Sequence, residues 1–151
     1  KNLDHIEKLV TGKSIRYSRA EAETIQEYEV LVIDNVGMLS SLYSYAEYAY
    51  IGGAFNNGLH NTLEAAAYGM PVFFGRGKKN MKFREAVDMV LLNAAFEISS
   101  WQEIDHLITL LYNDQEKWER SAAEAKKYVE DNLGATDRIM SYADKFLNSY
   151  E

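Results

Sequence analysis

Cysteine is absent from the 151-residue chain, and proline occurs once. Without cysteine there is no disulfide framework, no thiolate catalysis and no metal site built on cysteine ligands. No apolar run approaches the roughly 20 residues of a membrane-spanning helix, and the polar start, Lys1 to His5, predicts no signal peptide. Sixteen basic and 23 acidic side chains give a net charge of −7. Because nucleic-acid phosphates need a basic surface, general nucleic-acid binding is not expected.

The side chains that are present are typical of a soluble globular domain, with 47% hydrophobic and 26% charged residues. A chain of this length buries roughly two thirds of its unfolded surface, which supplies a core without disulfides or metals. We therefore expect a single domain over residues 1–151, with an α/β part over 1–100 and helices over 101–151.

Short apolar runs alternate with helical patterns over the first hundred residues. Strands are expected at residues 14–18, 30–33, 49–51, 72–74 and 95–98, and helices at 3–10, 39–48, 61–68 and 82–92. The run from Val30 to Ile33 holds only large aliphatic side chains, which predicts a strand buried on both faces. The alternation predicts a Rossmann-like α/β fold with an open parallel sheet and flanking helices.

The last third of the chain is predicted to be all-helical. Three apolar faces have helical spacing, beginning at Trp101, Trp118 and Ile139. Gly134 lies between the second and third of them and is the expected break.

Ligands of open α/β sheets bind beyond the carboxyl ends of the strands. One such loop, residues 34–41, contains Gly37, Met38 and Leu39 at the start of an expected helix. The free N–H groups of a first helical turn favour an anion, so a phosphate could bind there. Gly37 could equally be an ordinary turn residue.

A second loop, residues 52–64, is rich in glycine and asparagine and ends in His60, Asn61 and Glu64. Asn61 as N-cap with Glu64 three residues later would form a capping box, a purely structural role. His60 and Glu64 lie four residues apart, so on a helix they would share a face. A carboxylate there can accept hydrogen bonds from the two vicinal hydroxyls of a ribose, and both roles can coexist.

A third loop is strongly basic, because residues 76–84 hold five Lys or Arg side chains and no acid. These cations could face an anionic ligand or simply be solvated. The three histidines are far apart in sequence, so no metal site is expected, and none of the known phosphate-loop, dinucleotide or nucleophile-elbow motifs occurs.

Four motifs in this order resemble the C-terminal domain of Kdo transferases, in the form found in Bacteroidetes-type sequences. They are Ile33-Asp34-Asn35-Val36-Gly37-Met38-Leu39, Ile51-Gly52-Gly53-Ala54-Phe55, Gly58-Leu59-His60-Asn61-Thr62-Leu63-Glu64 and Tyr68-Gly69-Met70-Pro71-Val72. The resemblance covers nearly the whole chain. It implies the C-terminal half of a two-domain GT-B glycosyltransferase.

The resemblance implies transfer of Kdo, 3-deoxy-D-manno-octulosonic acid, from CMP-Kdo to a lipid A precursor in lipopolysaccharide biosynthesis. The reaction inverts the anomeric carbon and uses no cofactor. The implied donor-binding residues are Gly37, Met38, Leu39, Gly53, His60, Asn61 and Glu64, with Arg76 and Lys79 as candidate contacts for an anion.

Three of these roles are specific. By position, the backbone from Gly37 to Leu39 would face the CMP phosphate, Glu64 would hold the ribose hydroxyls, and Asn61 would lie near the phosphate or sugar. His60 matches a family histidine without an assigned role. The chain departs from the usual family sequence at two of these places. The family often has Gly-Glu-Leu where this chain has Gly37-Met38-Leu39, so any contact made by the glutamate side chain would be lost. It often has Gly-Pro where this chain has Gly75-Arg76.

The family's general base is a glutamate of an N-terminal domain, and no residue of this chain matches it. We therefore expect an N-terminally truncated donor-binding domain that is inactive alone, from an enzyme at the cytoplasmic face of the inner membrane. Acceptor and membrane would be reached only through the absent domain. An exposed sheet edge, and an exposed apolar face around Phe146, Leu147 and Tyr150, are also expected and favour self-association.

Two other functions remain open from the sequence. A GT-B domain that uses a UDP-sugar, in a transferase or an epimerase, shares the architecture and the glycine-rich turns. A non-catalytic α/β interaction module, such as a receiver-like domain, needs an acidic cluster at strand ends, where this chain has only Asp34.

Overall fold

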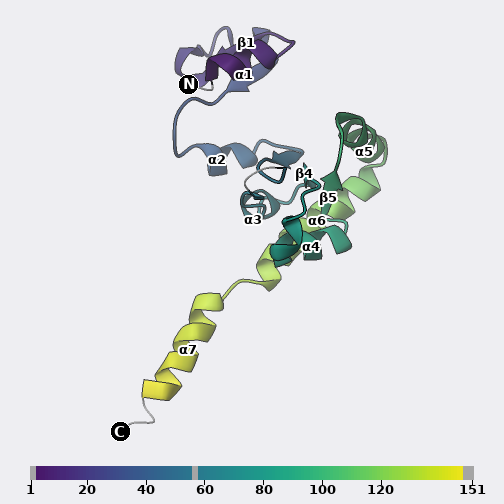
Figure 1. Cartoon of the computed structure of the whole chain (residues 1–151). Helices are drawn as coiled ribbons and strands as arrows, with labels where there is room; N and C mark the ends of the chain where they lie inside the picture. The colour runs from purple at the N-terminus through teal and green to yellow at the C-terminus, as the bar shows by residue number, and fades with distance from the viewer. Residues whose placement is uncertain (1–2, 56–57, 148–151) are drawn as a thin grey trace. The chain divides into compact units, whose positions relative to one another are not determined.

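The computed structural model describes residues 3–55 and 58–147 and divides the chain into two compact units, residues 1–41 and 42–151 (Figure 1). Unit 1 and unit 2 are described separately below. Within the described residues, no helix is long and apolar enough to cross a membrane.

Unit 1 is built on two parallel strands. Helix α1 (Leu3–Leu9) precedes β1 (Ser14–Arg16), and β1 pairs in parallel with β2 (Val30–Val32). Two short 3₁₀ turns lie between the strands, η1 (Tyr17–Arg19) and η2 (Ile25–Glu27).

Polar contacts join the elements of unit 1. The Arg16 guanidinium pairs with Asp4 and with Glu7 of α1, the latter at 2.7 Å, and these bonds lower the pKa of both carboxyl groups. Asp34, just after β2, accepts hydrogen bonds from the backbone N–H and the hydroxyl of Ser18 at 3.0 and 2.5 Å. Those two bonds lower the pKa of Asp34.

The predicted burial of the strand at residues 30–33 is wrong. Only Val32 is buried, whereas Leu31 is 39% exposed. The physical reason is the size of unit 1: over residues 3–38, the two-stranded sheet is accompanied by one short helix and two 3₁₀ turns, too few elements to cover both faces.

Unit 2 contains the main sheet and core. Its three parallel strands are β3 (Ala49–Ile51), β4 (Val72–Gly75) and β5 (Ala95–Ile98), in the order β3-β4-β5. All four residues of the central strand β4 are buried. Parallel sheets flanked by helices confirm the predicted fold class, although the strands divide between two sheets rather than forming one.

Helices cover the three-stranded sheet with two apolar clusters. The larger contains Ile51, Met70 and Phe74, and draws on α3 (Leu63–Ala66), α4 (Arg84–Leu91) and α6 (Gln115–Asp131). The smaller contains Phe73, Ile98 and Leu111, the last from α5 (Trp101–Asn113). Phe73 and Phe74 alternate between the clusters because successive strand residues face opposite sides.

The predicted helix at 3–10 is one residue shorter than expected, and three others are shortened further. Helix α2 (Leu39–Tyr43), which crosses the border between the units, replaces the expected 39–48, and α3 replaces the expected 61–68. The expected 82–92 becomes the 3₁₀ turn η3 (Asn80–Lys82) followed by α4. After α2 and α3 the backbone makes bonds between residues three apart, Tyr45 to Leu42 and Tyr68 to Ala65, which tighten and end a helix.

The predicted strand at 14–18 is also shorter, because its last residues form η1. The strand at 95–98 has its predicted bounds, and the buried strand at 72–74 extends to Gly75.

The three C-terminal helices are confirmed. Helix α5 begins at the N-cap Ser100, whose Oγ accepts from the Glu103 N–H at 3.3 Å, and Glu103 Oε2 accepts from the N–H of the preceding residue, Ser99, at 2.8 Å. Helix α6 ends at Asp131, Gly134 has a φ of 79°, and α7 (Ala135–Leu147) follows.

The expected apolar exposure of the last helix is present in α7. Phe146 and Leu147 are 62% and 70% exposed, and Ile139 and Tyr142 are exposed to a similar degree. Tyr150, which was expected to extend this face, lies outside the described residues.

Candidate functional site

The loop after β3 is closed by its own backbone. The Gly58 N–H donates to the Gly53 carbonyl and the His60 N–H donates to the Gly52 carbonyl, both at 3.2 Å. This places the stretch before α3 directly beyond the carboxyl end of β3, at the edge where parallel α/β sheets bind ligands.

Gly53 is the position on which this closure depends. Its φ of 93° lies in the left-handed region, and a Cβ there would lie 2.3 Å from the Gly58 carbonyl oxygen. The same Cβ would lie 2.9 Å from Cδ2 of His60, so the imidazole packs against the bare glycine backbone. Only glycine satisfies both constraints.

Asn61 and Glu64 form the polar end of the loop. Asn61 Nδ2 donates to Glu64 Oε1 at 2.9 Å, and Asn61 Oδ1 accepts from the Leu63 N–H at 3.0 Å. Both side chains are exposed. The amide therefore holds the carboxylate in place while leaving its outer oxygen to face solvent or a ligand.

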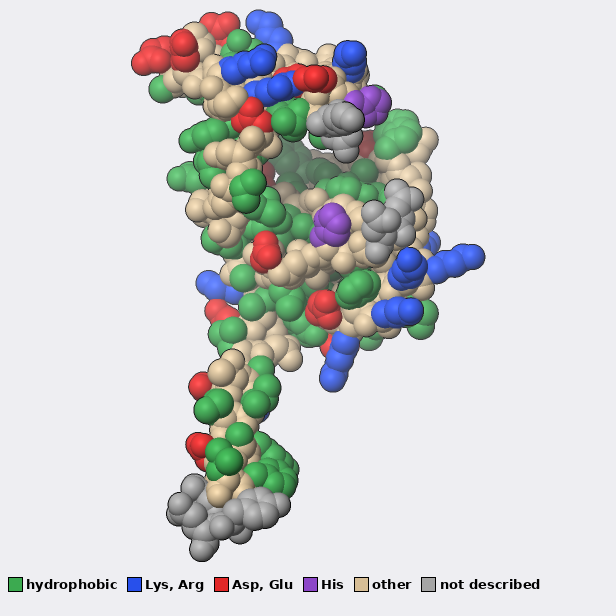
Figure 2. Space-filling view, turned by 60° about the vertical axis from the view of Figure 1, so that its left-hand side comes forward, with side chains coloured by type: hydrophobic (Ala, Val, Ile, Leu, Met, Phe, Trp, Pro, Cys, Tyr) green, Lys and Arg blue, Asp and Glu red, His purple; other side chains and the backbone are tan. Residues whose placement is uncertain are grey.

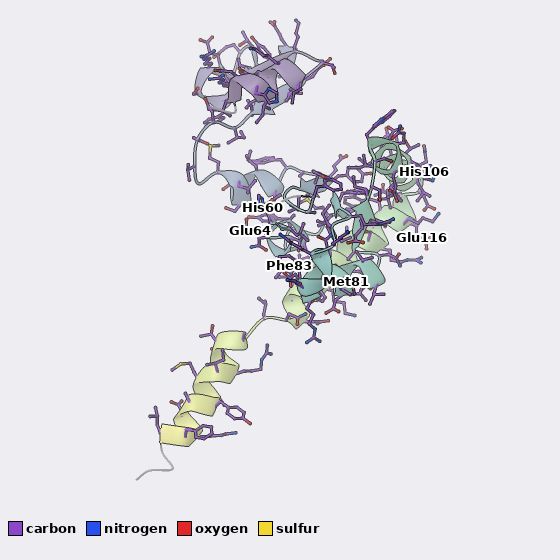
Figure 3. All side chains as sticks on the ribbon, in the orientation of Figure 1. His60, Glu64, Met81, Phe83, His106 and Glu116 are labelled. Carbon is purple, nitrogen blue, oxygen red and sulfur yellow. The ribbon has the colours of Figure 1, made fainter. Side chains whose placement is uncertain are left out.

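Two predictions about this turn are wrong in detail. The residue that precedes α3 is Thr62, and Glu64 binds the Asn61 side chain rather than its backbone N–H, so the contacts differ from a capping box. His60 precedes the helix, so it does not share a helix face with Glu64. The bond from the His60 N–H to the Gly52 carbonyl, and not helical spacing, positions His60 in the stretch before α3, where Figure 3 labels it.

Tyr43 is a residue near the candidate site that the sequence analysis did not single out as a site residue. Burial raises the pKa of its hydroxyl, and the negative charge of Glu64 raises it further, which places the phenol within electrostatic reach of that carboxylate. Its ring also packs against Tyr68, with the ring centroids 6.0 Å apart. Tyr43 lies about twenty residues from Glu64 in sequence and no motif connects them, so no local signal could have found it.

The first predicted loop belongs to unit 1 and is described within it. Gly37 has a φ of 98°, with no atom within 4 Å of a Cβ placed there. Met38 accepts a hydrogen bond from Asn35 Nδ2 at 2.9 Å on its sulfur, and α2 starts at Leu39 as the turn chemistry predicts. Gly53, His60, Asn61 and Glu64 belong to unit 2, where they lie together on one loop and the following helix.

The basic loop has a buried anchor. Asn80 is 3% exposed, and its Nδ2 donates to the Gly75 carbonyl and to Glu97 Oε1, both at 2.8 Å. Arg76 pairs with Glu97 and Glu103, at 3.8 and 3.6 Å, whereas Lys79 is exposed. Arg76 is thus already compensated by acids of the protein.

The geometry of this site is suited to binding a ligand that carries hydroxyl groups. A carboxylate fixed by an amide is suited to accept from sugar hydroxyls, and glycine backbone allows a ligand to approach closely. Over residues 3–55 and 58–147, no three His, Asp or Glu side chains group in a way that could hold a metal ion.

Fold and site together define a class: a Rossmann-like parallel α/β domain with an amide-fixed, exposed carboxylate beyond a strand end. No protein-family model matches the chain. Curated proteins do, and they confirm the resemblance to Kdo transferases.

The chain is 30% identical over 122 residues to the 3-deoxy-D-manno-octulosonic acid transferase of Rickettsia felis, covering 79% of this chain and 26% of that protein. It is 28% identical over 122 residues to the enzyme of the same name from Haemophilus influenzae, with 79% and 28% covered. A bifunctional glycosyltransferase/methyltransferase of Fusobacterium nucleatum is 28% identical over 97% of this chain and 23% of its own length.

A solved structure shares the fold. The C-terminal CMP-Kdo binding domain of WaaA from Acinetobacter baumannii superposes with a TM-score of 0.70 at 22% identity, covering 83% of this chain and 65% of that one. The chain spans about a quarter of the length of the curated relatives it matches, between 26% and 28% for the first three.

Proposed function

We propose that the chain is the donor-binding part of an inverting Kdo transferase and that it binds CMP-Kdo. The observation that carries this proposal is the 28–30% identity to Kdo transferases over 79% of the chain. The shared fold with a CMP-Kdo binding domain supports it.

The proposed roles follow the chemistry of each group. Glu64, fixed by Asn61, accepts from the ribose hydroxyls of CMP, and Asn61 also approaches the phosphate or sugar. Within unit 1, the backbone N–H groups from Gly37 to Leu39 are suited to a phosphate. Gly53 allows the loop closure that positions His60 directly before Asn61.

The basic loop contributes less to the proposed donor site. Lys79 is an exposed cation that can meet an anionic group of the donor. Arg76 would first have to give up Glu97 and Glu103, so we assign it a supporting role only.

CMP is expected to stabilise the chain against thermal unfolding more than UDP does. A ligand that binds only the folded state adds about 2.7 kcal/mol at a hundredfold excess over its dissociation constant. For about 150 residues, this corresponds to a midpoint shift of roughly 5–10 °C. The measurement is a thermal melt with each nucleotide titrated separately. Stronger stabilisation by UDP would overturn the Kdo assignment and favour a UDP-sugar enzyme.

For the whole protein we propose Kdo transfer to a lipid A precursor at the cytoplasmic face of the inner membrane. We place the general base and the acceptor site in a part of the enzyme that lies outside this chain. The chain by itself should therefore bind CMP yet release no CMP from CMP-Kdo when a lipid A precursor is added. Turnover by the isolated chain would show that a base lies within it.

A further inference from the structure

The basic loop divides into a compensated end and an uncompensated stretch. Arg76 is turned toward Glu97 and Glu103, as described above. Lys78, Lys79 and Lys82 are exposed, and none of them forms an ion pair with another described residue. Three positive charges therefore face outward without compensation.

The neighbouring charges do not cancel them. Arg84 pairs with Asp88 at 3.4 Å while its side chain stays 91% exposed. Asp88 also accepts a hydrogen bond from the Tyr128 hydroxyl at 3.0 Å. Its carboxylate therefore interacts with Arg84 and Tyr128 and does not pair with a lysine of the loop. Glu97 forms an ion pair with Arg76 and accepts a hydrogen bond from Asn80. The other acid near the lysines in sequence is Glu85, which is half-buried.

Met81 projects from the middle of these cations and is 86% exposed. The residues on either side explain why it does not fold back. Asn80 is buried and doubly hydrogen-bonded, and Phe83 packs against the main core. Gly77 lies so close to the Ala54 carbonyl that a Cβ there would be 2.1 Å from the oxygen. The turn is pinned on both sides, so the methionine is held outward.

The apolar surface continues from this turn onto α4. Met81, Val87 and Leu91 line a shallow hollow of about 200 Å³, and the last two side chains are 37% and 76% exposed. Figure 2 shows Lys and Arg side chains gathered on one side of unit 2 next to hydrophobic ones, and Figure 3 labels Met81 beside α4. We call Lys78, Lys79, Met81, Lys82, Val87 and Leu91 the basic-apolar surface.

We propose that the basic-apolar surface binds the anionic face of a lipid bilayer. Such a bilayer attracts the lysines through its headgroup charge and accepts the methionine and leucine into the headgroup boundary. A nucleic acid would use only the lysines and would leave the exposed methionine and leucine without an apolar partner. Apart from Lys79, no residue of this surface has a role in the proposed donor site, and the surface gives this domain a membrane contact of its own.

The test is sedimentation of the full chain with vesicles of neutral phosphatidylcholine, with and without about one third phosphatidylglycerol. A lysine near an anionic surface contributes roughly a fivefold change in partitioning. Lys78→Glu/Lys82→Glu, which spares the proposed donor contact Lys79, should therefore bind anionic vesicles at least about 25-fold more weakly. The matched control is Lys126→Glu/Lys127→Glu, which makes the same charge change at two exposed neighbouring lysines of α6. Its binding to anionic vesicles should weaken far less.

Because the chain has no cysteine, a single one can report where contact occurs. An environment-sensitive fluorophore on Met81→Cys should shift to shorter wavelength with anionic vesicles, whereas one on Lys127→Cys should not. Equal losses in both lysine pairs, no shift at position 81, or binding to short RNA in preference to vesicles would each overturn the proposal. CMP binding by the lysine variants should be retained, which separates this test from that of the donor site.

Discussion

Gly53→Ala is expected to lower the free energy of unfolding by about 2–4 kcal/mol, because a strained backbone and an overpacked contact each cost roughly 1–3 kcal/mol. A residue with a side chain disfavours the φ of 93°, and its Cβ would overlap the Gly58 carbonyl oxygen at 2.3 Å. Because a backbone atom is in the way, no rotamer change relieves the clash. Urea unfolding followed by circular dichroism measures the loss.

Gly52→Ala is the matched control for this substitution. It adds the same methyl group to the preceding residue, where nothing lies within 4 Å and the backbone is not left-handed. We expect a change within about 0.5 kcal/mol. A double variant, Gly53→Ala/His60→Ala, should remain destabilised, because removing the imidazole leaves the carbonyl clash. Equal stability of the two alanine variants would contradict the described loop closure.

Glu64→Gln should weaken CMP binding roughly 10- to 100-fold, because hydrogen bonds to a charged group are worth about 1.5–3 kcal/mol. Glutamine keeps an oxygen that can accept from Asn61 Nδ2, so the fold of the turn is preserved. What is lost is the charge facing the ribose hydroxyls. Calorimetric titration with CMP gives the affinity of each protein.

Two controls make this result specific to the ribose. Removing the 2′-hydroxyl from the nucleotide should weaken its binding to the native chain. The same removal should change the affinity of Glu64→Gln much less, because both changes delete the same hydrogen bond between carboxylate and hydroxyl. Glu116→Gln neutralises an exposed carboxylate on α6, whose label lies apart from Glu64 in Figure 3, and should leave CMP affinity unchanged. An unchanged affinity in Glu64→Gln would remove this residue from the donor site.

Patterns within one element predicted the structure well. The uninterrupted apolar run at Val72 to Phe74 predicted the buried central strand, and the helical spacing after Trp101 predicted three helices with a break at Gly134. For β4, α5 and α6 the elements that bury the side chains lie within the same unit, so local periodicity and tertiary packing agree, whereas α7 forms without burying any of its side chains.

Patterns that depended on distant partners were less reliable. The run from Val30 to Ile33 has the same aliphatic character as β4, but its strand lies in a small unit with too few covering elements. Arg76 looked like one of five equivalent cations, and only its contacts with Glu97 and Glu103 distinguish it from the lysines. Ion pairs between residues some twenty positions apart leave no trace in local sequence.

The sequence by itself determined the parallel α/β class, the helical C-terminal third and the positions of Asn61 and Glu64 as neighbours on one turn. These follow from short-range periodicity and turn chemistry, which operate over a few residues. The tertiary structure alone decided that Gly53 supports His60, that Tyr43 lies near Glu64, and that Met81 projects among uncompensated lysines. Those relations arise when loop closure and core packing bring distant residues together, and burial and charge compensation exist only after that has happened.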